Sequence, residues 1–225
     1  FTGAGISAES GIKTFRDSGG LWEEYKIEDV ATPQAWSKNP ALVQEFYNQR
    51  RKQALEAKPN AGHLAIAELQ KHFDVQVITQ NIDDLHERAG SKKVVHLHGE
   101  IKKSRSSATS ELIYNIKGWE LKMGERCEKG YQLRPHIVWF GEAVPEMDNA
   151  IDLVSAAAIF IVAGTSLNVY PAANLINFAP RGIPKFYVDP NPDLVYNFGE
   201  IKVIKDTAGK GLPALAEKLI KEFAS

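Results

Sequence analysis

The sequence has a single cysteine, Cys127, among 225 residues. One thiol cannot form an internal disulfide, so a disulfide framework is excluded and a reducing compartment such as the cytoplasm is expected. No apolar run reaches the roughly 20 residues that a membrane-spanning helix needs. The formal net charge is −1, from 27 basic and 28 acidic residues. Such a balance provides no field of one sign, so we expect neither nucleic acid nor a membrane surface as a partner.

Hydrophobic residues make up 44% of the chain, which is enough for a proper core. Its length fits one large domain, or one domain with a small insertion. Strand-like and helix-like segments alternate along the sequence, and this predicts an α/β fold with a doubly wound parallel sheet. The strands are expected near 73–80, 94–97, 137–140, 159–163, 185–188 and 201–204. Helices are expected at 40–57, after the cap Asn60, and near the C-terminal end.

Polar or glycine-rich segments follow most of these apolar strands. In an open parallel sheet, ligands bind outside the carboxyl ends of the strands, so we expect these segments to form one ligand site. They are Gly3-Ala4-Gly5, Gln80-Asn81-Ile82-Asp83, His98-Gly99, Gly164-Thr165-Ser166 and Asp189-Pro190-Asn191.

The first of these segments fits a dinucleotide-binding turn, with Gly3, Gly5 and Ala8 at the G-x-G-x-x-G/A positions. Glycines there allow close approach to a pyrophosphate. The alternative is a tight connection without a ligand. The usual ribose-binding acid about 20 residues further on is not evident. Instead Phe15-Arg16-Asp17 and a loop containing Trp22 follow, which we interpret as a lid over the cofactor.

In this order the motifs resemble those of the sirtuins (the Sir2 family), and the resemblance covers nearly the whole chain. It implies an NAD-dependent protein-lysine deacylase of the bacterial and archaeal type. The implied fold is a Rossmann-like core, about 1–25, 72–100 and 135–225, with a small domain built from insertions at about 26–71 and 101–134. NAD would be consumed, and an acyl-lysine protein or peptide would bind in the cleft; we expect the enzyme to be a monomer. The implied products are nicotinamide, lysine and 2′-O-acyl-ADP-ribose.

The resemblance also assigns roles to individual residues. His98 is the expected base, since its reference pKa of about 6.5 suits proton transfer near neutrality. Asn81 is the second expected catalytic residue and, with Gln80, would hydrogen-bond the ribose hydroxyls of the cofactor. Asp83 would accept a hydrogen bond from the nicotinamide amide, or simply cap the helix that follows. The other expected cofactor contacts are Gly3, Ala4, Gly5, Ala8, Phe15, Arg16, Trp22, Gln80, Ile82, Gly164, Thr165, Ser166, Asp189, Pro190, Asn191 and Ala208. Expected peptide contacts are Val138, Phe140, Gly141, Val169 and Tyr170.

Tyr47 and Arg50 are three residues apart on the predicted helix, so their side chains share a face with Val43 and Ala54. Arg50 has no carboxylate at i±3 or i±4, and a cation on an inward face needs an anionic partner. The pair resembles that of sirtuins which remove succinyl and malonyl groups as well as acetyl groups. The alternative is that Arg50 pairs with an acid elsewhere in the fold.

Most sirtuins hold a structural zinc with four cysteines, whereas the corresponding insertion here has only Cys127. Serines 104, 106, 107 and 110 stand where cysteines would be expected. One thiolate cannot make a closed tetrahedral site, so we predict no structural zinc. The insertion is weakly hydrophobic, and we expect it to be mobile and to pack through Leu112, Ile113, Tyr114, Trp119 and Leu121. His96 and His98 could bind a metal, but no third ligand is apparent, so we assign no metal residues.

Three other functions fit parts of the sequence. An ADP-ribosyltransferase would break the same glycosidic bond with a different nucleophile. A non-catalytic NAD sensor would not need His98 and Asn81. A dehydrogenase would fit the opening turn alone and would form NADH.

Overall fold

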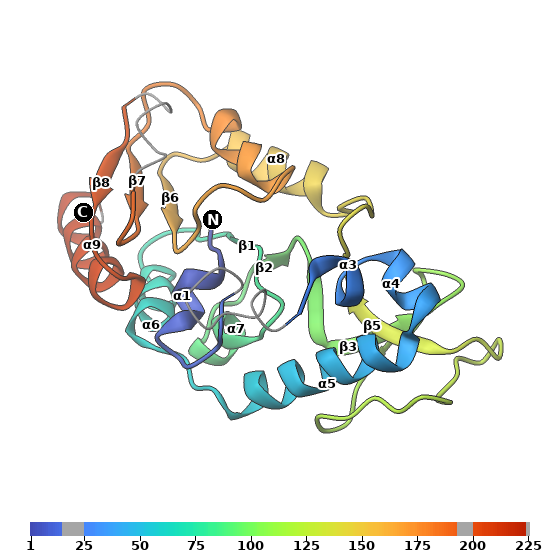
Figure 1. The fold of residues 1–225 in the computed structure, drawn as a ribbon. Coiled ribbons are helices and arrows are strands. Elements are labelled where there is room, and N and C mark those ends of the chain that lie inside the picture. The colour runs from blue at the N-terminus through green and yellow to red at the C-terminus, as the bar shows by residue number, and fades with distance from the viewer. Residues whose placement is uncertain (15–24, 193–199, 224–225) are drawn as a thin grey trace.

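The computed structural model describes residues 1–14, 25–192 and 200–223 (Figure 1). The helices among them are α1 (Ala4–Ala8), α3 (Ile27–Val30), α4 (Pro33–Lys38), α5 (Pro40–Glu56), α6 (Ala61–Leu69), α7 (Leu85–Ala89), α8 (Met147–Ser155), the 3₁₀ helix η1 (Ala172–Phe178) and α9 (Ala208–Phe223). The strands are β1 (Val77–Thr79), β2 (Val94–His96), β3 (Gly99–Ser106), β4 (Ile113–Asn115), β5 (Leu133–Ile137), β6 (Phe160–Ala163), β7 (Lys185–Val188) and β8 (Lys202–Ile204). No described helix is both long enough and apolar enough to cross a bilayer.

A parallel sheet forms the larger part of the molecule. β1 pairs with β2, and β7 lies between β6 and β8, all in parallel register. Thr2 joins the two groups, because it bridges Thr79 on one side and Ala163 on the other. The order across the sheet is therefore β2, β1, Thr2, β6, β7 and β8, and every carboxyl end lies at the same edge.

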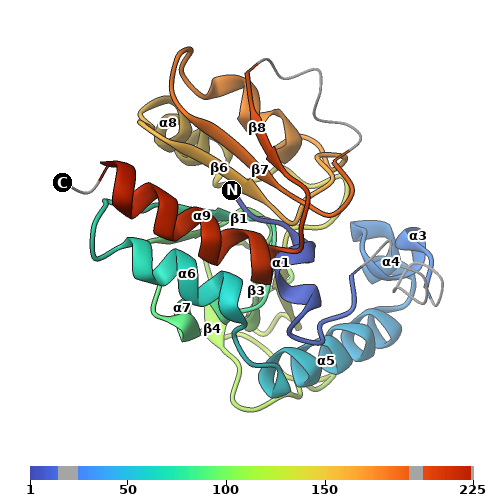
Figure 2. The same cartoon turned by 90° about the vertical axis from the view of Figure 1, so that its left-hand side faces the viewer.

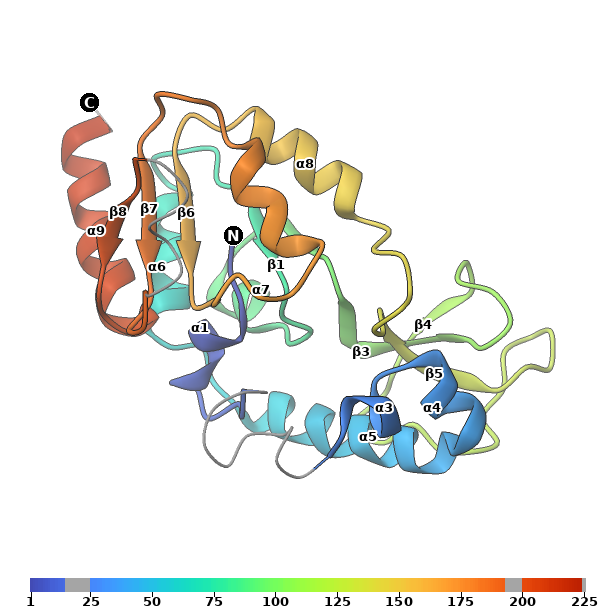
Figure 3. The same cartoon turned by 45° about the horizontal axis from the view of Figure 1, so that its top comes forward.

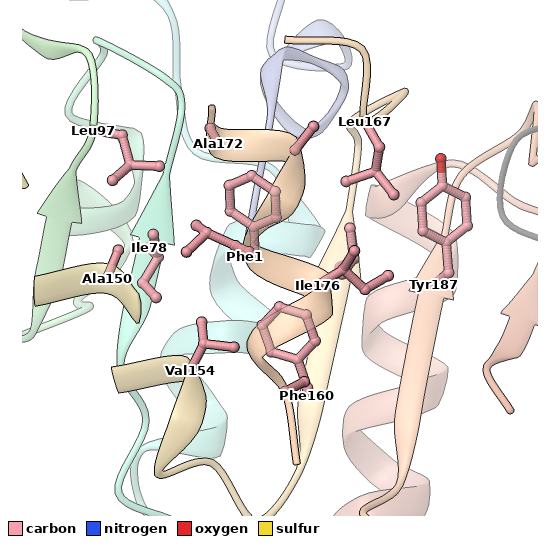
Figure 4. Packing of buried hydrophobic residues seen from close by; sticks show 14 residues of the cluster. Phe1, Ile78, Leu97, Ala150, Val154, Phe160, Leu167, Ala172, Ile176 and Tyr187 are labelled. Atoms are coloured by element: carbon pink, nitrogen blue, oxygen red, sulfur yellow. The ribbon is translucent and has the colours of Figure 1, made fainter. Parts of the chain in front are cut away.

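Both faces of this sheet are buried, which explains why its strands are continuous apolar runs. On one face Val77, Ala163 and Phe186 pack against α6 and α9. On the other face Ile78, Val162 and Tyr187 pack with Phe1 against α8 and η1 (Figure 4). Figures 2 and 3 show these helix pairs on opposite sides of the strands. The predicted α/β fold with a doubly wound parallel sheet is confirmed.

A second, antiparallel sheet has the order β4-β3-β5 and packs against α3, α4 and α5. The strand expected at 137–140 is wrong in position, because β5 runs from Leu133 to Ile137. Beyond it the backbone N–H groups leave the sheet: Trp139 N donates to Glu142 Oε2 and Phe140 N to the oxygen of Ala31. A short apolar run does not reveal such side-chain competition for the backbone.

Residues 102–131 were expected to be mobile; they contain most of β3, all of β4 and much of a small core of their own. Leu121, Cys127 and Leu133 are buried there, and Leu112, Tyr114 and Ile116 pack against them. Ile113 and Trp119 were expected in this core but are 44% and 41% exposed. Their part of the packing prediction is wrong. The alternation of β4 points Tyr114, not Ile113, inward.

The division into a core and two insertions remains our proposal. The packing of α6 favours one change to it, because Ala65, Ile66 and Leu69 lie against the parallel sheet and not in the small domain. Its boundaries at 100/101 and 134/135 fall inside β3 and β5.

Candidate active site

Three glycines bring the loops at the carboxyl edge of the parallel sheet into direct contact. Gly3 caps α1, and a Cβ there would lie 2.6 Å from Thr165 Cβ. A Cβ on Gly5 would lie 2.8 Å from Gly164 Cα, and one on Gly164, whose φ is +63°, only 2.3 Å from Ile6 N. Ala4 and Ala8 begin and end the same short helix. Glycine is therefore required at these three positions because the two loops cross in close contact, whether or not a cofactor is bound.

The side chain of Ser7 connects the first loop to the loop after β1. Its hydroxyl donates to Asp83 Oδ2 at 3.0 Å and accepts from Asn81 Nδ2 at 3.0 Å. His63 Nε2 lies 3.5 Å from the same oxygen. All four side chains are buried. Ser7 and His63 are not among the site residues predicted from the sequence, where their only signals are a helix start and a position in the first turn of a helix.

Of the two roles that the sequence left open for Asp83, the structure shows the contact at the start of the following helix, and the nicotinamide contact stays a prediction. Asp83 Oδ1 accepts from the backbone N–H of Leu85 at the start of α7, and its Oδ2 binds Ser7. Burial raises the pKa of Asp83, although these two hydrogen bonds act in the opposite direction. The carboxyl group is thus held in place, and Asp83 is only 5% exposed.

Gln80 lies between two other strand ends. Its Oε1 accepts from Thr165 Oγ1 at 2.8 Å, while its Nε2 is buried without a hydrogen-bond partner among the described residues. A buried amide N–H without a partner is costly, and a ligand oxygen would satisfy it. The sugar hydroxyls of a dinucleotide offer such oxygens, so the residues present fit NAD.

His98, two residues after β2, donates from Nδ1 to the backbone oxygen of Gln80 at 3.0 Å. A carbonyl oxygen only accepts, so the proton sits on Nδ1 and Nε2 keeps its lone pair. Burial lowers the pKa of His98, with the Gln80 contact acting against it. At neutral pH the ring is therefore neutral and can act as a base.

The part of the edge that was predicted to hold the adenosine is formed by the loops after β7 and before α9. Asp189 Oδ1 accepts from Asn191 N at 2.8 Å, and Pro190 between them is exposed. Ala208 is buried at the start of α9, whose first turn is capped by Glu9 through Thr207 Oγ1 and Gly209 N. Ser166 is exposed after Gly164, and Ile82 is half-buried beside the small-domain core. Phe15, Arg16 and Trp22 lie outside the described residues.

Tyr47 and Arg50 do share an inward face of α5, as the spacing predicts. Tyr47 is 4% exposed, with its ring 6.5 Å from that of Trp139, and burial raises its pKa to about 12. The Arg50 guanidinium lies 5.7 Å from the ring of Phe46. Burial lowers its pKa to about 10, while Tyr47 and Asp83 act to raise it. At neutral pH the pair is a neutral phenol beside a cation.

The segment expected to bind peptide runs directly beside His98. Val138 N donates to the His98 oxygen at 2.9 Å, and Phe140 and Gly141 are exposed. Glu142 fixes this segment, since it binds Arg105, Arg134 and Trp139 N. Of the two other residues expected to bind peptide, Val169 is half-buried and Tyr170 is 66% exposed.

Helix α5 joins the two insertions of the small domain through buried polar groups. Asn48 exchanges hydrogen bonds with Leu121, accepting from its N–H and donating to its oxygen. Arg51, fully buried, donates to the oxygens of Ile101 and Trp119. Nearby, Cys127 Sγ lies 3.4 Å from Ser106 Oγ. The described residues contain no group of three or more potential metal ligands.

Comparison with known proteins gives a consistent result. The family model described as "Sir2 family" matches residues 3–171. An NAD-dependent protein deacylase of Bacteroides thetaiotaomicron is 54% identical over 97% of this chain and 96% of its own length. One of the same description from Helicobacter pylori is 50% identical over 100% of this chain and 97% of its own length. A solved complex of a Sir2 homologue with NAD superimposes with a TM-score of 0.88, at 39% identity, covering 98% of this chain and 88% of that one. The chain therefore belongs to the Sir2 family, the sirtuins.

Proposed function

We propose that this chain is an NAD-dependent protein-lysine deacylase that removes succinyl, malonyl and acetyl groups. The observation that supports the reaction is the state of His98, which is neutral with Nε2 available, at the edge where Gln80 and Asn81 present their amides. Membership of the Sir2 family and the names of its relatives support the use of NAD and of protein substrates.

In this proposal NAD supplies the glycosidic bond that is broken and the ribose hydroxyl that receives the acyl group. Asp83 would accept a hydrogen bond from the nicotinamide amide and Asn81 would bind the ribose hydroxyls, and Ser7 already fixes both side chains. Gln80 Nε2 would donate to a ribose oxygen, and the loops around Gly164 and Asp189 would hold the phosphates and the adenosine. His98 Nε2 would accept the ribose hydroxyl proton while its Nδ1–H stays on the Gln80 oxygen.

Tyr47 and Arg50 carry the proposed acyl specificity. A guanidinium and a phenol donate hydrogen bonds well to a carboxylate, as the free end of a succinyl or malonyl group would require. Arg50 stays charged at neutral pH even though burial lowers its pKa. The segment Val138–Gly141 and the residues Val169 and Tyr170 are the proposed walls for the peptide.

The decisive experiment is incubation of the purified protein with NAD and acetyl-, malonyl- or succinyl-lysine peptides, followed by mass spectrometry. We expect free lysine peptide, nicotinamide and acyl-ADP-ribose, with the two acidic acyl groups removed as well as acetyl. An ADP-ribosylated protein would instead indicate a transferase. Binding of NAD without any product would indicate a sensor.

A further inference from the structure

Asn81 is held through three of its polar groups, and each is held by a different residue. Its backbone N–H donates to Thr79 Oγ1 at 3.0 Å, and its side-chain Nδ2 donates to Ser7 Oγ at 3.0 Å. Its backbone oxygen lies 2.9 Å from His96 Nδ1. The amide oxygen Oδ1 takes part in none of these contacts, and the position of the whole residue depends on them.

His96 has a second partner that His98 lacks. His96 Nε2 lies 2.7 Å from Glu87 Oε1, on α7. Since a carbonyl oxygen and a carboxylate both only accept, His96 satisfies both contacts when both ring nitrogens carry protons. His98 makes the same kind of contact to the preceding carbonyl, that of Gln80, and within residues 1–14, 25–192 and 200–223 no carboxylate binds its other ring nitrogen. The two histidines thus bind two successive carbonyl oxygens, and of the two His96 has a carboxylate at its other ring nitrogen.

We propose that His96 and Glu87 are a positioning pair, which holds Asn81 for cofactor binding only while both ring nitrogens of His96 carry protons. This inference rests on the proposed function for its link to catalysis, but not for its link to binding. It adds two residues that do not touch the substrate and act through Asn81.

The competition between the two acceptors explains why the charge matters. A neutral imidazole has a single N–H, and a carboxylate accepts a stronger hydrogen bond than an amide oxygen does. On deprotonation Glu87 keeps the N–H, and the bare Nδ1 then faces the Asn81 oxygen. The carbonyl is released, and Asn81 is no longer fixed at that end.

The charged groups around His96 favour its protonated form. Burial lowers the pKa of His96, but the hydrogen bond and charge of Glu87, the Asn81 oxygen and the charge of Glu100 on β3 raise it above its ordinary value. The carboxyl group of Asp83 also lies within electrostatic range. The neighbour that would oppose protonation of His96 is His86 on α7, but burial holds the pKa of His86 itself well below its usual value.

The test compares Glu87→Gln with the wild-type protein across pH. The amide that this substitution introduces can donate to Nε2, so neutral His96 keeps its Nδ1–H on Asn81. Wild-type kcat/KM for NAD should fall about tenfold or more as pH rises through the His96 pKa, because small displacements are costly in catalysis. In Glu87→Gln this alkaline decline should disappear, while the acid limb set by His98 stays. Glu68→Gln, which removes an exposed charge on α6, is the control and should behave like wild type.

Two readouts do not depend on turnover. NMR titration of the histidine rings should give His96 a pKa above 6.5 in the wild type and a lower one in Glu87→Gln. Calorimetry with ADP-ribose should show affinity that weakens at alkaline pH in the wild type only. An alkaline decline that Glu87→Gln leaves unchanged, or a His96 pKa at or below 6.5, overturns the inference. If no acyl peptide is deacylated but the NMR and calorimetry results are as expected, the proposed function is wrong while the role of His96 and Glu87 in binding still holds.

Discussion

The Nδ1 atom of His98 lies 3.0 Å from the backbone oxygen of Gln80, and this contact fixes which ring nitrogen can act as a base. The tautomer is set by the chain itself, before any substrate binds, because the carbonyl can only accept. Val138 N in turn holds the oxygen of His98, so the base is tied to the proposed peptide segment as well.

Replacing His98 by Ala should lower kcat/KM for deacylation by about 10²- to 10⁴-fold, the usual contribution of a general base. In the wild type the neutral ring is the active form, so activity should fall as pH drops. Burial lowers the His98 pKa, and the midpoint of this acid limb should therefore lie below 6.5. Initial rates between about pH 5 and 8 measure both effects. His72→Gln, at an exposed position, is the control; a midpoint at or above the ordinary histidine value would contradict the assignment.

The parallel sheet was predicted well because both of its faces are buried. Successive residues such as Val77 and Ile78 point to opposite faces, so both had to be apolar. The strand near 73–80 was predicted too long, since only Val77–Thr79 pairs. The site loops could be placed at one edge from their position after strands alone. The contacts that polar residues make across the fold could not be predicted, because nothing local in the sequence joins Ser7 to Asp83 or Asn48 to Leu121.

Arg50→Met should abolish desuccinylation and demalonylation while sparing part of the deacetylation. Met keeps much of the side-chain volume but removes the donors that a distal carboxylate needs, whereas an acetyl group has no such carboxylate. The measurement is kcat/KM for matched acetyl and succinyl peptides. Gln49→Ala, exposed on the same helix, serves as the control. Equal loss of both activities in Arg50→Met would refute the specificity assignment.

Purified protein should contain far less than one equivalent of zinc by elemental analysis. The expectation follows from the ligands, because Cys127 faces the Ser106 hydroxyl at 3.4 Å and a serine is a poor zinc ligand. Treatment with EDTA should then leave the melting temperature unchanged. Tightly bound zinc at one equivalent, or a chelator-induced loss of stability, would show that the prediction is wrong.

Asn48→Ala should destabilise the protein by about 2 kcal/mol, because the mutation leaves a buried N–H of Leu121 without its partner. The loss should appear in urea unfolding monitored by tryptophan fluorescence. The same Gln49→Ala control, on the exposed face of α5, should change the free energy of unfolding by no more than about 0.5 kcal/mol. If both variants unfold at the same urea concentration, the Asn48–Leu121 contact does not stabilise the packing of the second insertion on α5.

Gly164→Ala tests whether the crossing of the two loops shapes the cofactor site. The residue has φ +63°, and its new Cβ would lie 2.3 Å from Ile6 N, so either the 164 loop or α1 must shift. Gly182→Ala is a matched control, because its φ is +82° but no atom lies within 4 Å of the added Cβ. Both variants carry the cost of a left-handed residue, about 1–2 kcal/mol, while only Gly164→Ala adds the clash, about 1–3 kcal/mol more. ADP-ribose affinity, measured by calorimetry on folded protein, should fall at least tenfold in Gly164→Ala and stay at the wild-type value in Gly182→Ala. Equal affinity in the two variants would mean that the close approach of α1 to Gly164 is a packing feature with no part in cofactor binding.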